Sequence, residues 1–165
     1  MPQRIQEWIQ THSIEGYQHR LITLDNCFRG TKYIQDCIEN KQWAKAADYL
    51  RIYYLNQEGG IYADADTEIS GNFDKFLDNR MFVFKEDSWY LWNGVIGSEP
   101  NHPFLKYYLN TVDRNFRTDQ QTFDAGMQFF CEAYYIADRE GLGMKIYEYS
   151  ELDNILKHYK LKSWI

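Results

Sequence analysis

The sequence has few prolines, few cysteines and no long apolar run, and each shortage argues against a class of protein. Three prolines in 165 residues leave no room for a proline-rich linker, so we expect one domain over residues 1–165. No apolar run approaches the roughly 18 residues of a membrane span, and the N-terminus has no continuous apolar segment of a secretory signal. The three cysteines lack Cys-x-x-Cys spacing, which argues against a disulfide framework and a zinc site. We therefore expect a cytoplasmic protein with no transmembrane segment.

Basic residues are also scarce. The chain has 18 Lys and Arg against 24 Asp and Glu, which gives a net charge of −6. A protein that binds a phosphate backbone usually presents a basic face, so we expect no nucleic-acid partner. Aromatic residues are plentiful, with 14 Tyr, 10 Phe and 5 Trp. Such rings either pack a core or line a groove for bases and sugars, and composition leaves both open.

The spacing of apolar residues predicts helices and strands that alternate along the chain. Residues 43–54 have helical spacing, and Gly59 and Gly60 follow where a helix C-terminus is expected. Pro103 opens a second clear helix that runs to residue 116. We predict further helices over residues 5–9, 33–38, 122–138 and 151–157, and strands over residues 21–24, 61–63, 81–84, 91–98 and 144–149. Strands that alternate with helices indicate an α/β fold built in layers.

Two carboxylates follow the apolar strand over residues 61–63. Asp64 and Asp66 stand at its C-terminal end, where α/β folds place their ligands. Two carboxylates from one turn suit Mg²⁺ or Mn²⁺, and leave further coordination positions to water and a diphosphate. A bare Asp-x-Asp is a weak motif, and a solvated acidic turn is the structural alternative.

Two other carboxylate sites can be tested on the same residues. An EF-hand loop that starts at Asp64 would put Ile69 where glycine is required and Lys75 where glutamate is required, so this site is excluded. A phosphohydrolase with an aspartate nucleophile usually has Asp-x-Asp-Gly-Thr. Here Thr67 comes one place too early and no glycine intervenes, so a phosphohydrolase remains only as an alternative.

Asp48 and Arg51 lie three residues apart on the predicted helix, so both can project from one face. They could form an ordinary exposed ion pair, which contributes about 0–1 kcal/mol to stability. Alternatively, the arginine could neutralise the phosphates of a metal-bound diphosphate.

Residues 44–66 combine these features in one pattern. It reads Ala-x-x-Ala-Asp-x-x-Arg, then an apolar helix, then Gly-Gly-Ile-Tyr-x-Asp-x-Asp. The pattern resembles the signature of the DXD-containing glycosyltransferases of the capsular-polysaccharide and yeast-type initiating mannosyltransferase group, with the clostridial glucosylating toxins as more distant relatives. The resemblance continues through residues 92–98 and 100–105 and covers residues 17–110 well. The matching residues in the first stretch are Ala44, Ala47, Asp48, Arg51, Gly59, Gly60, Ile61, Tyr62, Asp64 and Asp66.

The resemblance implies a GT-A type fold, with a Rossmann-like mixed sheet flanked by helices. Asp64 and Asp66 would hold the Mn²⁺ or Mg²⁺ ion, and the donor would be a UDP- or GDP-sugar. His158 could add an imidazole ligand, which suits Mn²⁺ better than Mg²⁺. Relatives begin with a strand of the type Ile-Pro-Lys-Ile-Ile-His-Tyr-Ile-Trp, and nothing before Trp8 is similar to it. We therefore expect the fold to lack the usual first strand.

The resemblance also implies which residues contact the donor. Asp48, Arg51 and Asn93 would lie at the sugar, and Tyr62 would lie at the nucleotide. Relatives often end with a His-Trp/Tyr-x-Gly-Ser-Trp run over the diphosphate. Ser163 and Trp164 match its end, although the spacing from His158 is one residue longer and a lysine replaces the glycine. A Thr-Gly-Pro turn of the relatives is missing, because residues 121–126 contain no proline.

These observations predict a metal-dependent, retaining glycosyltransferase that transfers a sugar from a nucleotide-sugar to a saccharide acceptor in surface polysaccharide synthesis. One alternative is a catalytically silent relative that only binds a sugar or a nucleotide-sugar. The other is the phosphohydrolase. Sugar transfer or donor hydrolysis, binding alone, or phosphate release from monoesters would separate the three.

Overall fold

The computed structural model describes residues 16–86, 88, 90–118 and 125–159. The helix predicted over residues 5–9 lies outside this range. The helices are α2 (Lys32–Glu39), α3 (Trp43–Glu58), α4 (Pro103–Thr118) and α5 (Met127–Arg139). The strands are β1 (Gly60–Ala63), β2 (Thr67–Ile69), β3 (Met81–Lys85), β4 (Leu91–Ser98), β5 (Lys145–Glu148) and β6 (Leu156–His158), and 3₁₀ helices span Asp74–Phe76 and Tyr149–Leu152.

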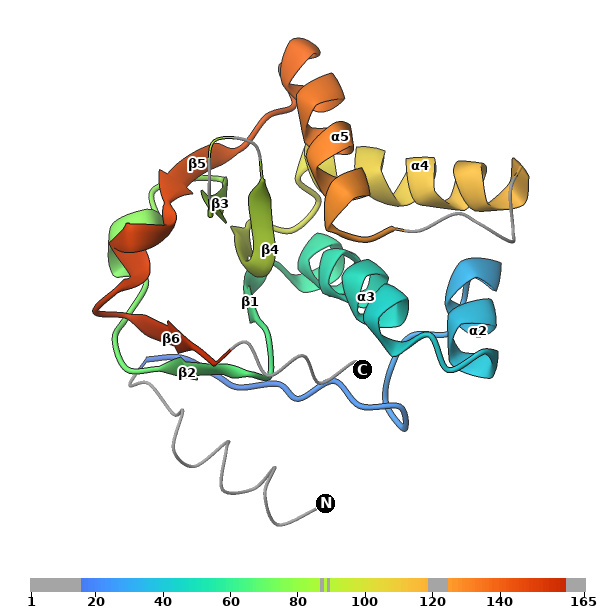
Figure 1. Cartoon of the computed structure of the whole chain (residues 1–165), viewed down its shortest axis with the longest axis horizontal. Helices are drawn as coiled ribbons and strands as arrows, with labels where there is room; N and C mark the ends of the chain where they lie inside the picture. The colour runs from blue at the N-terminus through green and yellow to red at the C-terminus, as the bar shows by residue number, and fades with distance from the viewer. Residues whose placement is uncertain (1–15, 87, 89, 119–124, 160–165) are drawn as a thin grey trace.

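A mixed four-stranded sheet forms the centre of the molecule (Figure 1). Its strand order is β1-β4-β3-β5, with β4 antiparallel to both of its neighbours and β3 parallel to β5. A separate two-stranded antiparallel sheet pairs β2 with β6. All eight residues of β4 are buried, because the strand is paired on both sides and covered on both faces.

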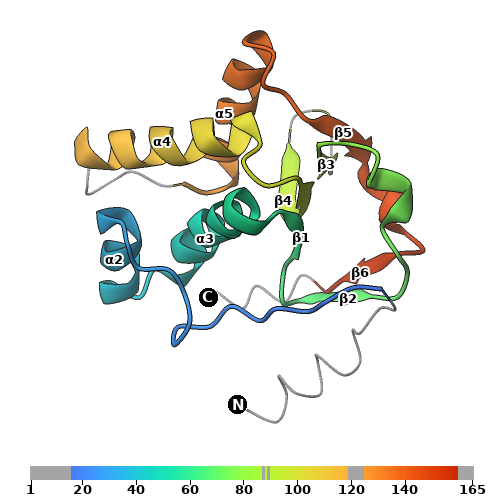
Figure 2. The ribbon, with the colours of Figure 1, turned by 180° about the vertical axis from the view of Figure 1, so that it is seen from behind.

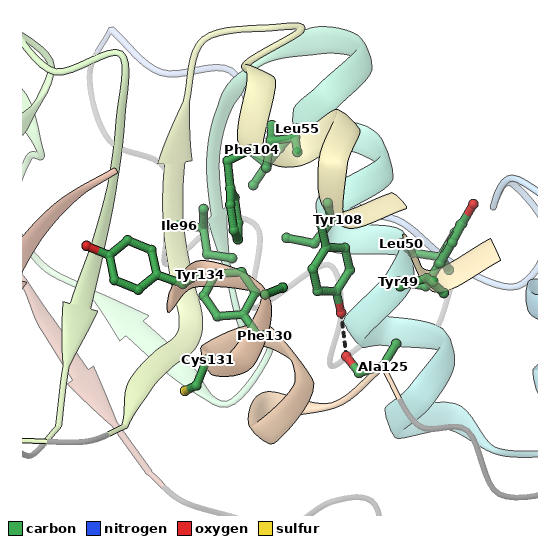
Figure 3. Packing of buried hydrophobic residues seen from close by; sticks show 14 of the residues in the cluster. Tyr49, Leu50, Leu55, Ile96, Phe104, Tyr108, Ala125, Phe130, Cys131 and Tyr134 are labelled. Atoms are coloured by element: carbon green, nitrogen blue, oxygen red, sulfur yellow. Dashed lines mark hydrogen bonds between the residues drawn. The ribbon is translucent and has the colours of Figure 1, made fainter. Parts of the chain in front are cut away.

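Helices cover one face of the central sheet, as the two opposite views in Figures 1 and 2 show. Phe104 and Tyr108 of α4 and Phe130 of α5 are almost fully buried, and they pack with Ile96 of β4 (Figure 3). The Tyr108 hydroxyl donates a hydrogen bond to the Ala125 carbonyl, which fixes the chain just before α5. Aromatic rings thus build much of this core, the first of the two uses that the composition left open.

The other face of the sheet packs against the short elements. Phe82, Phe84 and Trp92 point to this side and contact Phe76 and Leu156, which belong to the first 3₁₀ helix and to β6. The β2–β6 sheet is therefore anchored on the central sheet by its own apolar residues.

A register shift interrupts the ladder between β3 and β4. Val83 pairs with Ile96, but the next residue of β3, Phe84, pairs with Trp92. The intervening segment, residues 93–95, bulges away from β3 while Val95 stays paired with Ala63 of β1. Bulges of this kind often lie beside active sites, because they redirect backbone and side-chain groups.

Most predicted elements are confirmed, and two are wrong. Residues 21–24 form no strand, because the chain turns there and the Asn26 amide oxygen accepts a hydrogen bond from the Thr23 backbone. Residues 151–157 form no α-helix. A 3₁₀ helix ends at Leu152, and Leu156 pairs with Ile69 of β2 instead. That pairing joins segments far apart in the chain, and local spacing carries no sign of it. Helix α5 begins only at Met127 within the described residues.

Burial of Tyr49 should make the fold less stable at alkaline pH. Burial raises the pKa of this phenol to about 12, from an ordinary value of 10.0. Between these two values the unfolded chain has lost the proton and the folded chain has kept it, so stability falls as pH rises through this window. Two pKa units correspond to about 3 kcal/mol. We expect Tyr49→Phe to lose less stability than the wild type between pH 10 and 12, measured by urea unfolding; equal losses would contradict this.

Candidate active site

A tight turn joins α3 to β1 and sets the direction of the strand. Gly59 caps the helix after Glu58: its amide donates to the Leu55 carbonyl, and its φ of 69° favours glycine. A Cβ atom at Gly59 would lie 2.8 Å from Pro100, so the turn also packs closely against the chain after β4. The turn carries β1 back alongside α3, and β1 then delivers Asp64 next to the helix.

Arg51 is the centre of a buried charged cluster. Its Nη2 lies 3.0 Å from Asp48 Oδ1, and its Nη1 lies 3.3 Å from Asp64 Oδ1. The guanidinium also packs over the Tyr62 ring, 4.7 Å from the ring centroid. Only 6% of the Arg51 side chain is exposed, against 15% for Asp48 and 24% for Asp64. One arginine thus forms ion pairs with two carboxylates, which come from α3 and from the end of β1.

The bulge in β4 completes this cluster. The Asn93 carbonyl accepts a hydrogen bond from Arg51 Nη1 at 2.5 Å, and the Asn93 side-chain amide donates to Asp48 Oδ1 at 3.0 Å. The neighbouring Gly94 carbonyl accepts from the Asp64 backbone amide at 2.8 Å. Because residues 93–95 leave the ladder with β3, these groups are turned toward α3 and β1.

The cluster shifts the pKa of its members. Burial alone lowers the pKa of Arg51, but Tyr62, Asp48 and Asp64 outweigh this, so its pKa lies above the ordinary value. Burial raises the pKa of the Tyr62 phenol, and Arg51 offsets this only in part. Both groups therefore keep their protons at neutral pH, arginine as a cation and tyrosine as a hydrogen-bond donor.

The two carboxylates of the Asp-x-Asp motif lie in different surroundings. Asp64 Oδ1 accepts a 2.7 Å hydrogen bond from the Tyr62 hydroxyl in addition to its contact with Arg51. Its second oxygen makes no such contact with the described part of the chain, so it is open to a ligand. Asp66 is more enclosed: its side chain is 8% exposed, and Oδ1 lies 3.4 Å from His158 Nε2.

Strand β6 holds the second carboxylate from the other side. The Tyr159 amide, just past β6, donates to the Asp66 carbonyl at 2.9 Å. His158 pairs with Thr67 across the β2–β6 ladder, and its ring lies 5.0 Å from the Trp92 ring. The C-terminal strand thus brings His158 to Asp66, as the sequence prediction of a shared site requires.

The donor chemistry fits a divalent cation. An open carboxylate oxygen on Asp64 and the nearby carboxylate of Asp66 are the hard ligands that Mn²⁺ and Mg²⁺ prefer. Over residues 16–86, 88, 90–118 and 125–159, no three His, Cys, Asp or Glu side chains gather as a metal-binding group. Any cation would therefore need ligands from water or a substrate, and His158 as a ligand stays a prediction.

A cavity of about 440 Å³ opens beside the cluster. Its walls are mostly apolar, and they come from the chain before α2, from α3 and from β1, with Leu24, Trp43, Leu50, Arg51 and Tyr62 among them. Arg51 and Tyr62 thus line a space that could hold a small organic molecule.

The structure brings together all of the predicted site residues that it describes, in two linked groups. Asp48, Arg51, Tyr62, Asp64 and Asn93 form one, and Asp66 with His158 forms the other. Ser163 and Trp164 lie outside the described residues.

Sequence reasoning missed the roles of two residues. Gly94 belongs to the bulge, and an Asn-Gly pair inside a strand pattern was the available signal. Thr67 closes the turn of the Asp-x-Asp motif, and a hydroxyl residue directly after the motif was the only sign of this.

Within the described residues, no helix is both long and apolar enough to cross a membrane.

Comparison with known proteins points to one family. Residues 3–83 match the model of the glycosyltransferase sugar-binding region containing the DXD motif. The chain is 33% identical over 104 residues to an uncharacterized glycosyltransferase of Acanthamoeba polyphaga mimivirus. These residues make up 60% of this chain and 41% of the relative. It is 29% identical over 72 residues to inositol phosphoceramide mannosyltransferase 2 of Schizosaccharomyces pombe. These residues make up 44% of this chain and 21% of the relative. The chain thus spans less than half the length of either relative.

A solved structure has a similar fold. The PaToxG glycosyltransferase superposes with a TM-score of 0.53 at 24% identity, over 67% of this chain and 45% of that protein. The expected mixed sheet flanked by helices and the GT-A fold are confirmed. Residues 3–83 therefore match the sugar-binding region of the DXD-containing glycosyltransferases, and the described residues of the chain have the GT-A fold.

Proposed function

We propose that this chain forms the donor site of a glycosyltransferase that takes a sugar from a nucleoside diphosphate sugar. The observation that carries the proposal is the buried cluster around Arg51, in which α3, β1 and the β4 bulge meet beside a cavity. An ordinary helix ion pair needs neither the bulge nor the second carboxylate. Burying three charged side chains costs desolvation free energy, and charged groups with shifted pKa values beside a cavity are typical of functional sites, so the cluster favours a ligand site.

The contacts of each side chain support a role for it in this site. Arg51 is fixed by Asp48 and by the Asn93 carbonyl, so its position is set before any substrate arrives. The Asn93 amide and the Asp48 carboxylate are a donor and an acceptor at the same point, a pairing that suits sugar hydroxyls. Tyr62 orients Asp64 through its hydroxyl and faces the cavity, where it could contact the nucleotide.

Asp64 and Asp66 would hold a divalent cation, Mn²⁺ or Mg²⁺. When bound, such an ion stabilises the negative charge that develops on a departing diphosphate. Two observations support this assignment: one oxygen of Asp64 is open to a ligand, and Asp66 lies on the same turn, two residues further along the chain. His158 would either add a ligand or orient Asp66.

The finer parts of the proposal rest on the family resemblance. We propose transfer with retention of configuration, a saccharide acceptor and a role in surface polysaccharide synthesis. The fission-yeast relative is named for mannosyl transfer to inositol phosphoceramide, so a lipid with a hydroxylated headgroup should be tested as an acceptor beside saccharides. A cytoplasmic location stays a prediction from the sequence.

A panel of UDP- and GDP-sugars with Mn²⁺ tests the proposal. We expect donor hydrolysis or transfer with one of them, and no activity when the cation is removed by a chelator. Donor binding without turnover would favour the silent relative. Phosphate release from monoesters, with no nucleotide-sugar bound, would favour the phosphohydrolase and contradict the proposal.

A further inference from the structure

The two carboxylates of the Asp-x-Asp motif sit on a four-residue turn, residues 64–67. The Asp64 carbonyl accepts a hydrogen bond from the Thr67 amide at 3.1 Å, which is the usual bond of a β-turn. The same carbonyl accepts a second bond, from the Thr67 hydroxyl at 2.6 Å. Thr67 is only 1% exposed, so both bonds are shielded from water.

The ends of this turn are fixed by different parts of the fold. At the first end, the Gly94 carbonyl in the β4 bulge holds the Asp64 amide. At the other end, the Tyr159 amide beside β6 holds the Asp66 carbonyl. Thr67 begins β2 and links the two ends, because its backbone pairs with β6 while its hydroxyl holds Asp64.

We propose that Thr67 is a positioning residue for the metal carboxylates, and this inference rests on the proposed function. Its hydroxyl sets the distance between Asp64 and Asp66 by clamping the main chain of the turn. Thr67 itself would touch neither cation nor substrate, because its hydroxyl is already engaged by the Asp64 carbonyl, the one side-chain hydrogen bond that Thr67 makes among the described residues. Removal of a group that orients a metal ligand without touching the metal typically lowers metal affinity about 10–100-fold. We therefore expect a roughly tenfold loss here.

Thr67→Val tests the hydroxyl alone. Valine has nearly the same shape, and the Asp64 carbonyl keeps the amide bond, so no buried acceptor loses its last partner. We expect Mn²⁺ to bind about tenfold more weakly, measured by electron paramagnetic resonance of free Mn²⁺ with the metal alone. Thr67→Ser keeps the hydroxyl and should restore affinity close to that of the wild type. The fold is followed by circular dichroism, and Thr67→Ala replaces the valine variant should that one fail to fold.

Thr111→Val is the matched control. Thr111 is also buried, and its hydroxyl donates to the Tyr107 carbonyl at 2.8 Å inside α4, away from the turn. This control should bind Mn²⁺ as the wild type does. Equal affinity of the Thr67→Val and wild-type proteins would overturn the inference and leave the proposed function intact. Equal weakening by serine and valine would overturn the role of the hydroxyl, and a wild type that binds no Mn²⁺ would overturn the metal assignment together with this inference.

Discussion

Replacement of Arg51 by alanine should destabilise the protein by about 3 kcal/mol and abolish donor binding. The change leaves two carboxylates, Asp48 and Asp64, without their counter-charge in surroundings that are mostly shielded from water. Removal of one partner of a buried pair typically costs 3–5 kcal/mol, and the partial exposure of Asp64 favours the lower end, about 3 kcal/mol. For a chain of this length, that lowers the melting temperature by roughly 10 °C.

The sequence left open an ordinary exposed Asp48–Arg51 pair, and the structure excludes this alternative, because only 6% of the Arg51 side chain is exposed. Arg20 offers the matched control, because it pairs with Glu58 of α3 in an exposed position. Arg20→Ala should change stability by less than about 1 kcal/mol. Similar melting temperatures for the two variants would show that the Arg51 cluster adds nothing to the fold. Donor binding is measured separately, at a temperature where the Arg51 variant is folded.

Replacement of Asp66 by asparagine should remove Mn²⁺-dependent donor binding and leave the fold nearly unchanged. Asparagine has the same shape and can still contact His158, and the backbone bond from Tyr159 does not depend on the side chain. The substitution, however, replaces one of the two anionic ligands that the proposed cation needs with a neutral amide oxygen. Isothermal titration with nucleotide-sugar, with and without Mn²⁺, measures the effect, and we expect a loss of at least about a hundredfold in metal-dependent affinity or in rate.

Glu68→Gln controls for the loss of a nearby carboxylate. Glu68 is exposed on β2, two residues beyond Asp66, and its carboxylate accepts a hydrogen bond from the Tyr159 hydroxyl. The variant should bind donor and cation as the wild type does. An Asp66→Asn protein that retains full Mn²⁺-dependent affinity would contradict the assignment of Asp66 to the metal.

Local sequence patterns were sufficient for the elements that carry the charged cluster. Helix α3 has long helical periodicity and a glycine C-cap, and β1 and β3 are short apolar runs of the expected type. The three-residue spacing of Asp48 and Arg51 followed from the helix alone. The resemblance to a family then supplied Asn93, which no local pattern connects to α3.

Local sequence patterns could not predict the contacts between segments that are far apart in the chain. The β2–β6 ladder joins Thr67 to His158 over more than half of the chain, and three residues per strand leave hardly any alternation to detect. The same ladder explains why the predicted helix over residues 151–157 was wrong. Exposure of the Asp48–Arg51 pair could not be judged either, because the carbonyl of the β4 bulge and the carboxylate of Asp64 are what cover it.

The two groups of the site belong to parts of the fold that should differ in local stability. Asn93 lies on β4, which is buried along its whole length and is paired on both sides at residues 96–98, so the amides of that segment should exchange with solvent only when the whole domain unfolds. Thr67 and His158 lie on a ladder of three residues per strand, which has few hydrogen bonds of its own and relies on apolar contacts with the central sheet, so it should open more easily than β4. Fast exchange at β2 and β6 would mean that the Asp66 side of the site samples open states while the Arg51 side stays closed. A ligand that bridges the two sides would then slow exchange in this ladder most strongly, and part of its binding energy would go into closing it.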